Sequence, residues 1–388
     1  MNDEPDQYAK LLADLDAQAA HRFLRTIGSH QEAHITLKGR RMLCFGSNNY
    51  LGLAGHPHVR AAVRNAVEQW GWGAGASRLV TGHMEPHAQL EQILADFKKT
   101  EATLILPTGY QANLAAIRAL AGRGDVLFLD KLNHASIIDA ARGSGAIVRV
   151  FPHRDYRKLE RLLERSSGTR RRVIVTDTLF SMDGDFADLP RLVELKHRYT
   201  AHLCVDEAHA TGVFGETGRG LAEMMGVEED IDVVVGTLSK ALGGIGGFIA
   251  ASQSFIDWVI NTAGSFIYTT AIPPAACAAA AAALELVINE PWRREKLLRM
   301  ANDLGMALRA RGFDTSGSTS QIVPVILGDN EVALRLSHHL EENGILAPAI
   351  RPPTVPRGRA RLRISLTAEH EEADIEHLLN ALGASGPP

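Results

Sequence analysis

Short apolar runs alternate with segments of helical periodicity through the middle of the chain. Runs rich in β-branched and aliphatic residues predict seven strands, which are Ala102–Leu106, Val126–Leu129, Ile147–Phe151, Val173–Asp177, His202–Val205, Val233–Thr237 and Gly247–Ala251. Helical patterns such as Gln111–Ala121 and Leu189–Tyr199 separate them. Apolar strands regularly separated by helices are typical of a mostly parallel sheet covered on both faces. The pattern therefore predicts an α/β fold.

Both ends of the chain follow other patterns. Near the start, four apolar residues have helical spacing, namely Tyr8, Leu11, Leu12 and Leu15. They predict an amphipathic helix with Arg22 and Arg25 near its end, followed by a β segment over Ile35–Phe45. Beyond about Glu290, helices alternate with two β runs, Gln321–Leu327 and Arg361–Leu366.

These changes of pattern predict three parts. Residues 1–47 form an N-terminal helix and β segment, residues 48–290 form a large domain, and residues 291–388 form a small C-terminal α+β domain. The sequence shows no internal repeat and no long linker between them.

Composition narrows the class of protein. With 388 residues, 45% hydrophobic and 22% charged, the chain can bury a large core. A net charge of −4 offers no basic field, so we expect no nucleic-acid partner.

Three widely spaced cysteines suggest neither disulfides nor zinc, and the histidines lack metal-ligand spacing, so we expect no metal. The acidic start lacks an export signal, and the apolar stretch Ala275–Ile288 is too short to span a bilayer. We expect a cytoplasmic protein with no membrane partner.

Polar residues follow the predicted strand ends. They are residues 107–110, Asn133 and His134, Ser181, Asp206, His209, Thr237 and Lys240. In an open α/β sheet, ligands bind beyond the carboxyl ends of the strands. The residues are therefore expected to converge on a single site.

Lys240 and Asp206 indicate the chemistry of that site. Lys240 follows a buried strand, where partial desolvation favours the neutral amine that can form an imine. Asp206 follows another strand and can hold a proton on a ring nitrogen through a charge-assisted hydrogen bond. A Schiff-base lysine and an acidic partner for a pyridinium nitrogen are the protein groups that pyridoxal 5′-phosphate requires.

Two other motif readings fail on their context. Residues 206–209 spell Asp-Glu-Ala-His, the tetrapeptide of one helicase class, but the chain has no Gly-Lys pair and so no phosphate loop. The Gly71–Gly75 segment resembles a dinucleotide-binding turn, but it follows the helical pattern Val59–Trp70 rather than a strand.

With these residues placed, the chain resembles the α-oxoamine synthase family of pyridoxal phosphate enzymes from about Arg22 to Leu382. The matching segments are Ser47–Gly52, Gly75–Val80, Asp177–Gly184, Val205–Gly212 and Thr237–Ala241. The segment Ala349–Pro356 resembles the biotin-pathway branch of that family. The resemblance implies an aminotransferase-like, fold type I architecture with a smaller C-terminal domain.

It also implies roles for the cofactor site. Lys240 would form the Schiff base and move the α-proton, Asp206 would pair with the ring nitrogen, and His209 would bind the phenolic oxygen. His134 would stack on the ring and face the substrate. The remaining cofactor contacts implied are Gly109, Tyr110, Ser181, Thr237 and, from a neighbouring subunit, Thr270 or Thr269.

For the substrates, the resemblance implies a second group of residues. Arg363 would bind the amino-acid carboxylate, with Asn48 as a further substrate contact. Arg25 and Thr354 would contact the acyl substrate, and Arg351 is another candidate for its carboxylate.

The implied reaction is the decarboxylative condensation of L-alanine with a pimeloyl thioester, carried on coenzyme A or a carrier protein, in a homodimer with shared sites. Two alternatives change only the substrates: glycine could replace alanine, as in aminoketobutyrate ligase or 5-aminolevulinate synthase, or the acyl group could differ. A third alternative is a non-catalytic interaction subunit. The presence of Lys240, Asp206 and His209 argues against it.

Overall fold

The computed structural model describes residues 6–385 and divides the chain into two compact units. Unit 1 contains the N-terminal residues up to Asn48, Met182–Asp185 and the C-terminal part from Leu297. Unit 2 contains Asn49–Ser181 and Phe186–Lys296. The N-terminal segment, which the sequence pattern set apart, therefore shares a unit with the C-terminal residues. The acidic start of the chain, Met1–Pro5, lies outside the described residues.

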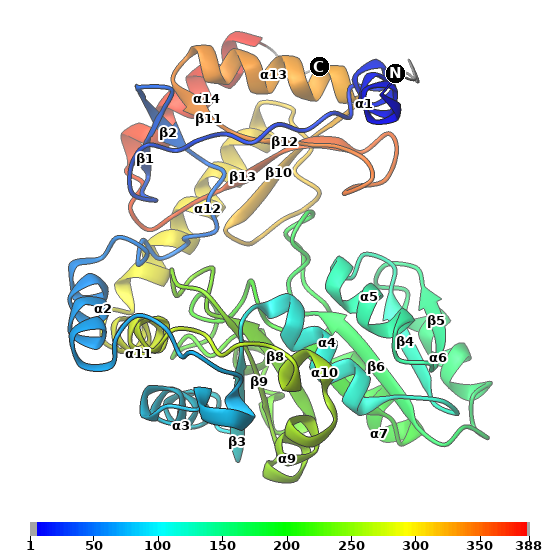
Figure 1. The fold of residues 1–388 in the computed structure, drawn as a ribbon. Helices are drawn as coiled ribbons and strands as arrows, with labels where there is room; N and C mark the ends of the chain where they lie inside the picture. Colours follow the sequence, from blue (N-terminus) through cyan, green and yellow to red (C-terminus); the bar gives the residue numbers. More distant parts are fainter. Residues whose placement is uncertain (1–5, 386–388) are drawn as a thin grey trace, which may run out of the picture. The chain divides into compact units, whose positions relative to one another are not determined.

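A seven-stranded sheet of order β3-β9-β8-β7-β6-β4-β5 forms the centre of unit 2 (Figure 1). Its strands are β3 Ala102–Leu106, β4 Val126–Asp130, β5 Ile147–Phe151, β6 Arg172–Asp177, β7 His202–Asp206, β8 Val233–Thr237 and β9 Gly247–Ala251. All seven were predicted. The pairs among β5, β4, β6, β7 and β8 are parallel, and β9 runs antiparallel to both β3 and β8. The prediction of a mostly parallel sheet is confirmed.

Helices cover this sheet. They are α2 Pro57–Trp70, α3 Glu85–Lys98, α4 Gly109–Leu120, α5 Ala135–Arg142, α6 Tyr156–Glu164, α7 Leu189–Tyr199, α8 Leu221–Met224, α9 Gln253–Thr262, α10 Gly264–Ile267 and α11 Pro274–Asn289. Buried aliphatic side chains of α4, α5 and α9 form one continuous cluster with those of the strands. This cluster is one part of the buried core of unit 2.

The alanine-rich helix α11 is internal to unit 2. It packs against α2 and α3, and most of its residues are buried. Small alanine side chains allow such close helix packing, and the apolar stretch that is too short to span a bilayer is thus an internal helix of unit 2. Within the described residues, no helix has both the length and the apolar composition needed to cross a bilayer.

Unit 1 contains two three-stranded sheets, β1-β2-β11 and β10-β13-β12. Their strands are β1 His34–Leu37, β2 Arg40–Cys44, β10 Ile322–Gly328, β11 Ile345–Leu346, β12 Ala349–Ile350 and β13 Ala360–Ser365. The helices are α1 Gln7–Ala17, α13 Asn330–Glu342 and α14 Glu372–Ser385, with α12 Trp292–Ala310 containing the boundary between the units. The expected α+β character of the C-terminal part is confirmed.

The first helix is shorter than predicted. It ends at Ala17, and Ala19 adopts a positive φ of 50°, which a continuing right-handed helix does not allow. Arg22 and Arg25 therefore lie in an extended segment rather than near the end of the helix. Side chains project differently from a helix and from an extended segment. The early end of α1 therefore decides which partners Arg22 and Arg25 contact.

Candidate active site

Lys240 lies in the loop between β8 and β9, three residues after the end of β8. Its Nζ is 2.9 Å from Nε2 of His209, and Nδ1 of the same ring is 2.7 Å from the hydroxyl of Tyr50. Tyr50 and His209 are both buried. The structure therefore brings together two residues that were predicted and a tyrosine that was not.

Asp206 is the last residue of β7 and is buried. Its Oδ2 accepts a hydrogen bond of 2.7 Å from Nδ2 of Asn113, and its Oδ1 accepts one of 2.8 Å from the backbone N–H of Ala208. Asn113 lies in α4 and also donates to Ser136. These two hydrogen bonds hold the Asp206 carboxylate in one orientation. Asn113 was not predicted from the sequence. The one sequence feature that marks it is its polar side chain among the buried alanines of α4.

A second carboxylate lies beside Asp206. Asp177 ends β6, is its register partner across the parallel pair, and accepts a 2.8 Å hydrogen bond from the backbone N–H of His134. Burial raises the pKa of Asp177 well above its ordinary value, and the neighbouring charge of Asp206 raises it further. Asp177 therefore takes up a proton more readily than an exposed aspartate does.

His134 caps the N-terminus of α5. Its Nδ1 lies 2.7 Å from the hydroxyl of Ser136, and its side chain is exposed rather than enclosed in the core. The charges of Asp206 and Lys240 both act on His134 and on Asp177. These four groups therefore form one electrostatic cluster at the carboxyl ends of the strands, which contains three predicted residues and, in addition, Asp177.

The N-terminus of α4 lies against the end of β8. Thr108 caps the helix by accepting from the N–H of Gln111, and Gly109 is its first residue. A Cβ on Gly109 would lie 3.4 Å from Thr237, and one on Gly247 would lie 2.6 Å from the Gly109 backbone. The backbone approach at Gly247 therefore requires glycine, whereas a Cβ on Gly109 would make an ordinary contact. A helix N-terminus presents backbone N–H groups and a positive dipole end, which suit a phosphate.

The other predicted cofactor contacts in unit 2 have varied surroundings. Thr237 donates to the carbonyl of Gly246, and Tyr110 donates to the carboxylate of Asp139. Thr269 accepts a hydrogen bond from the side chain of Gln111, whereas Thr270 is exposed and forms a β-bridge with Ser77. Ser181 follows the end of β6. Tyr110 is thus the second residue of α4, and Thr237 lies close to Gly109, the first residue of that helix.

In unit 1, Arg363 lies on β13 and is buried. It donates to Oδ1 of Asn48 at 3.1 Å and to the hydroxyl of Ser365 at 2.8 Å. The predicted pair of substrate contacts, Arg363 and Asn48, is thus in direct contact. The side chain of Arg363 is therefore buried among polar partners rather than solvated on the strand face.

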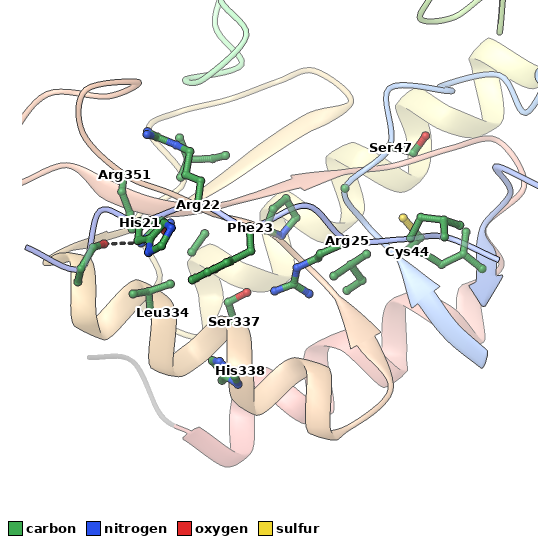
Figure 2. A pocket seen from close by; sticks show the side chains of 18 of the residues that line it. His21, Arg22, Phe23, Arg25, Cys44, Ser47, Leu334, Ser337, His338 and Arg351 are labelled. Carbon is green, nitrogen blue, oxygen red and sulfur yellow. Dashed lines mark hydrogen bonds between the residues drawn. The ribbon is translucent and has the colours of Figure 1, made fainter. Parts of the chain in front are cut away.

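A pocket of about 760 Å³ in unit 1 is lined by three arginines, Arg22, Arg25 and Arg351, together with apolar side chains (Figure 2). Arg22 lies 3.4 Å from the hydroxyl of Thr354. Arg25 instead forms a 2.6 Å ion pair with Glu341. Sequence reasoning chose Arg25 and passed over Arg22, and the extended chain after α1 is what places Arg22 beside Thr354.

Arg351 is held by the main chain. Its guanidinium donates to the carbonyl oxygens of Ala19 and His21, the latter at 3.1 Å. Burial lowers the pKa of Arg351, and the charge of Arg22 lowers it further. Arg351 thereby ties the extended segment that carries Arg22 to the strand segment around Ile350.

Known proteins resemble this chain over nearly its whole length. A family model for aminotransferase class I and II matches residues 40–382. The 8-amino-7-oxononanoate synthase of Geobacter sulfurreducens is 50% identical over 377 residues, which cover 97% of this chain and 96% of the relative.

Solved structures agree with the sequence comparison. Serine palmitoyltransferase from S. paucimobilis, solved with a bound PLP–myriocin aldimine, has a TM-score of 0.93 and 33% identity, covering 98% of this chain and 96% of that one. An 8-amino-7-oxononanoate synthase from Francisella tularensis has a TM-score of 0.78 and 28% identity, covering 89% and 97%. The chain therefore belongs to the aminotransferase class I and II family, and within it to the α-oxoamine synthases that its motifs resemble.

Proposed function

We propose that this protein catalyses the pyridoxal phosphate-dependent condensation of L-alanine with a pimeloyl thioester, releasing CO2 and the thiol carrier to form 8-amino-7-oxononanoate for biotin synthesis. The observation that carries the proposal is the 50% identity with an 8-amino-7-oxononanoate synthase over 97% of the chain. The serine palmitoyltransferase neighbours are only 33% identical, so they support the fold and the cofactor more than the substrates.

The residues present fit pyridoxal phosphate. Lys240 supplies a primary amine for an imine, and Asp206 supplies a buried carboxylate oriented by Asn113 and a backbone N–H. The N-terminus of α4, with Gly109 and Thr237 in close contact, supplies donors for a phosphate. When bound, the cofactor's conjugated pyridinium ring accepts the electron pair left at the substrate α-carbon.

The chain's own residues manage protons and orientation. The Nζ of Lys240 would take the α-proton of alanine and later return a proton to the product. Asp206 would keep the ring nitrogen protonated, because an ionised carboxylate favours a nearby cation. His209, 2.9 Å from the lysine amine, would bind the phenolic oxygen, and His134 would cover the ring face. Ser181, Tyr110 and Thr270 remain proposed cofactor contacts.

For the substrates, we propose that Arg363 binds the alanine carboxylate, since its planar fork suits bidentate recognition and Asn48 and Ser365 orient it. We propose Arg22, with Thr354, for the acyl substrate, because the guanidinium of Arg22 lies against that hydroxyl. Arg25 is engaged by Glu341 and is the weaker choice. Arg351 would position Arg22. By family analogy, the enzyme would act in the cytoplasm as a homodimer with shared sites.

A substrate matrix tests the proposal. The holoenzyme is incubated with L-alanine, glycine or L-serine against pimeloyl-CoA, a pimeloyl carrier protein, succinyl-CoA, acetyl-CoA and palmitoyl-CoA, and products are identified by mass. We expect the highest kcat/KM for L-alanine with a pimeloyl thioester. A higher value for glycine, or for serine with palmitoyl-CoA, would reassign the protein to another member of the same family.

A further inference from the structure

Tyr50, His209 and Lys240 form a chain of short contacts in the interior of unit 2. The Tyr50 hydroxyl lies 2.7 Å from Nδ1 of His209, and Nε2 of that ring lies 2.9 Å from the lysine amine. Tyr50 is fully buried and His209 is buried. A buried imidazole needs partners for both ring nitrogens, because an unsatisfied buried polar atom is costly.

The segment that carries Tyr50 is rigid. Oδ1 of Asn49 accepts from the N–H groups of Leu53 at 2.9 Å and Ala54 at 3.1 Å, which closes a tight turn. The loop after Lys240 packs directly on this turn: a Cβ on Gly243, whose φ is +66°, would lie 2.4 Å from the Ala54 nitrogen. The N–H of Gly243 in turn donates to the carbonyl of Lys240. Tyr50 and Lys240 are therefore held on mutually packed loops with His209 between them.

The proton position on His209 depends on what faces Nε2. When its amine is charged, Lys240 has only donors, so Nε2 must accept from it, and the ring proton then sits on Nδ1 and points to the Tyr50 oxygen. To donate to the phenolic oxygen of the cofactor, His209 must instead carry its proton on Nε2, and Nδ1 must accept. A hydroxyl can both accept and donate, so Tyr50 satisfies Nδ1 in either case. A phenylalanine could do neither.

We infer that Tyr50 is a positioning residue that sets the tautomer of His209: its hydroxyl accepts from Nδ1 when the lysine amine faces Nε2, and donates to Nδ1 when the cofactor's phenolic oxygen faces Nε2. The inference rests on the cofactor named in the proposed function, but not on alanine or the pimeloyl group as substrates. It adds to the site a residue that acts through His209.

Two cofactors and two variants test this role. Tyr50→Phe removes the hydroxyl, and the matched control Tyr156→Phe removes another tyrosine hydroxyl of unit 2, which accepts from the N–H of Asp188. Each protein is freed of cofactor and titrated with pyridoxal phosphate and with its analogue lacking the 3-hydroxyl, followed by absorbance.

We expect Tyr50→Phe to bind pyridoxal phosphate about five- to tenfold more weakly than the wild type, the effect of one lost hydrogen bond. It should bind the 3-deoxy analogue as the wild type does, because that analogue offers His209 no phenolic oxygen. Tyr156→Phe should change neither affinity. An equal loss for both cofactors, or no loss for either, would overturn the inference.

A second measurement needs no variant. Long-range 1H–15N spectra of histidine-labelled wild-type protein report which ring nitrogen of His209 carries the proton. We expect Nδ1 at pH 7 without cofactor and Nε2 with pyridoxal phosphate bound, and the same tautomer in both states would overturn the inference. A protein that passes both tests but makes a different product would leave the inference standing and refute the proposed function.

Discussion

Arg361 and Arg363 lie two residues apart on β13, so their side chains leave the same face of the strand, yet they hold different partners. Arg361 is 1% exposed and donates to Oδ1 of Asp183 and to the carbonyl of Met182, at 2.8 and 2.9 Å. Arg363 donates to Asn48 and Ser365. One arginine thus pairs with a carboxylate of unit 1, and the other is the residue for which we propose binding of the alanine carboxylate.

Arg361→Met should lower the free energy of unfolding by about 3–5 kcal/mol, because it leaves the partly buried carboxylate of Asp183 without its guanidinium. Arg363→Lys should change stability little but raise KM for L-alanine about tenfold, since an ammonium cannot form the bidentate pair. Urea unfolding and steady-state kinetics separate the two effects. The assignment is wrong if Arg363→Lys keeps the wild-type KM for alanine.

Lys240→Ala should lower kcat at least about a thousandfold, because the variant loses both the imine and the proton-transferring amine. The absorbance band of the bound imine should disappear as well. The control is Lys158→Ala in α6, which should leave both unchanged. Retention of turnover together with that band in Lys240→Ala would refute the proposed role.

The two arginines after α1 should respond differently to substitution. Arg22→Ala should raise KM for the pimeloyl thioester about tenfold, the cost of losing one hydrogen bond to a charged group. Arg25→Ala removes a partly exposed ion pair with Glu341, which contributes about 1 kcal/mol or less. Steady-state kinetics at saturating alanine measure both. A larger effect on KM in Arg25→Ala would favour the residue that the sequence motifs first indicated.

Lys98 and Glu207 form a buried ion pair of 2.9 Å, with side chains only 3% and 2% exposed. The Lys98 amine also binds the hydroxyl of Thr211, and Glu207 adjoins Asp206. Lys98→Met should destabilise the protein by about 3–5 kcal/mol, because it leaves a buried carboxylate unpaired. The double variant Lys98→Met/Glu207→Gln should regain part of that loss in urea unfolding. A double variant that is less stable than Lys98→Met would contradict this account.

Asp177 should make stability depend on pH. Burial and the charge of Asp206 raise the pKa of Asp177 in the folded protein. Its contribution to the free energy of unfolding is therefore fully present below the pKa of about 4 that it has in the unfolded chain, and is lost as the pH rises through the folded pKa. Asp177→Asn stays neutral and can still accept from the His134 N–H. In cofactor-free protein, we expect this variant to gain stability over the wild type as pH rises from 4 to 7, by urea unfolding. The exposed Asp257→Asn is the control, and a gain that shrinks with rising pH would refute the assignment.

Local pattern determined much of this protein. Apolar runs separated by helical periodicity predicted all seven strands of the large sheet, because side-chain period and burial are properties of adjacent residues. The position of Lys240, Asp206, His209 and His134 after strand ends predicted their convergence, since the carboxyl ends of parallel strands meet at one edge. The direction of the Arg25 side chain could not be predicted in this way, because an arginine past the end of a helix has no periodic neighbour to indicate it.

Partners far apart along the chain required the tertiary structure. Asn113 reaches Asp206 across 93 residues, Tyr50 reaches His209 across 159, and Arg22 reaches Thr354 across 332. No periodicity links such residues, because their contact depends on how separately formed elements pack. The sequence by itself therefore determined the sheet, the family and the candidate reactive residues, whereas the packing of loops and helices decided which side chains hold those residues in position.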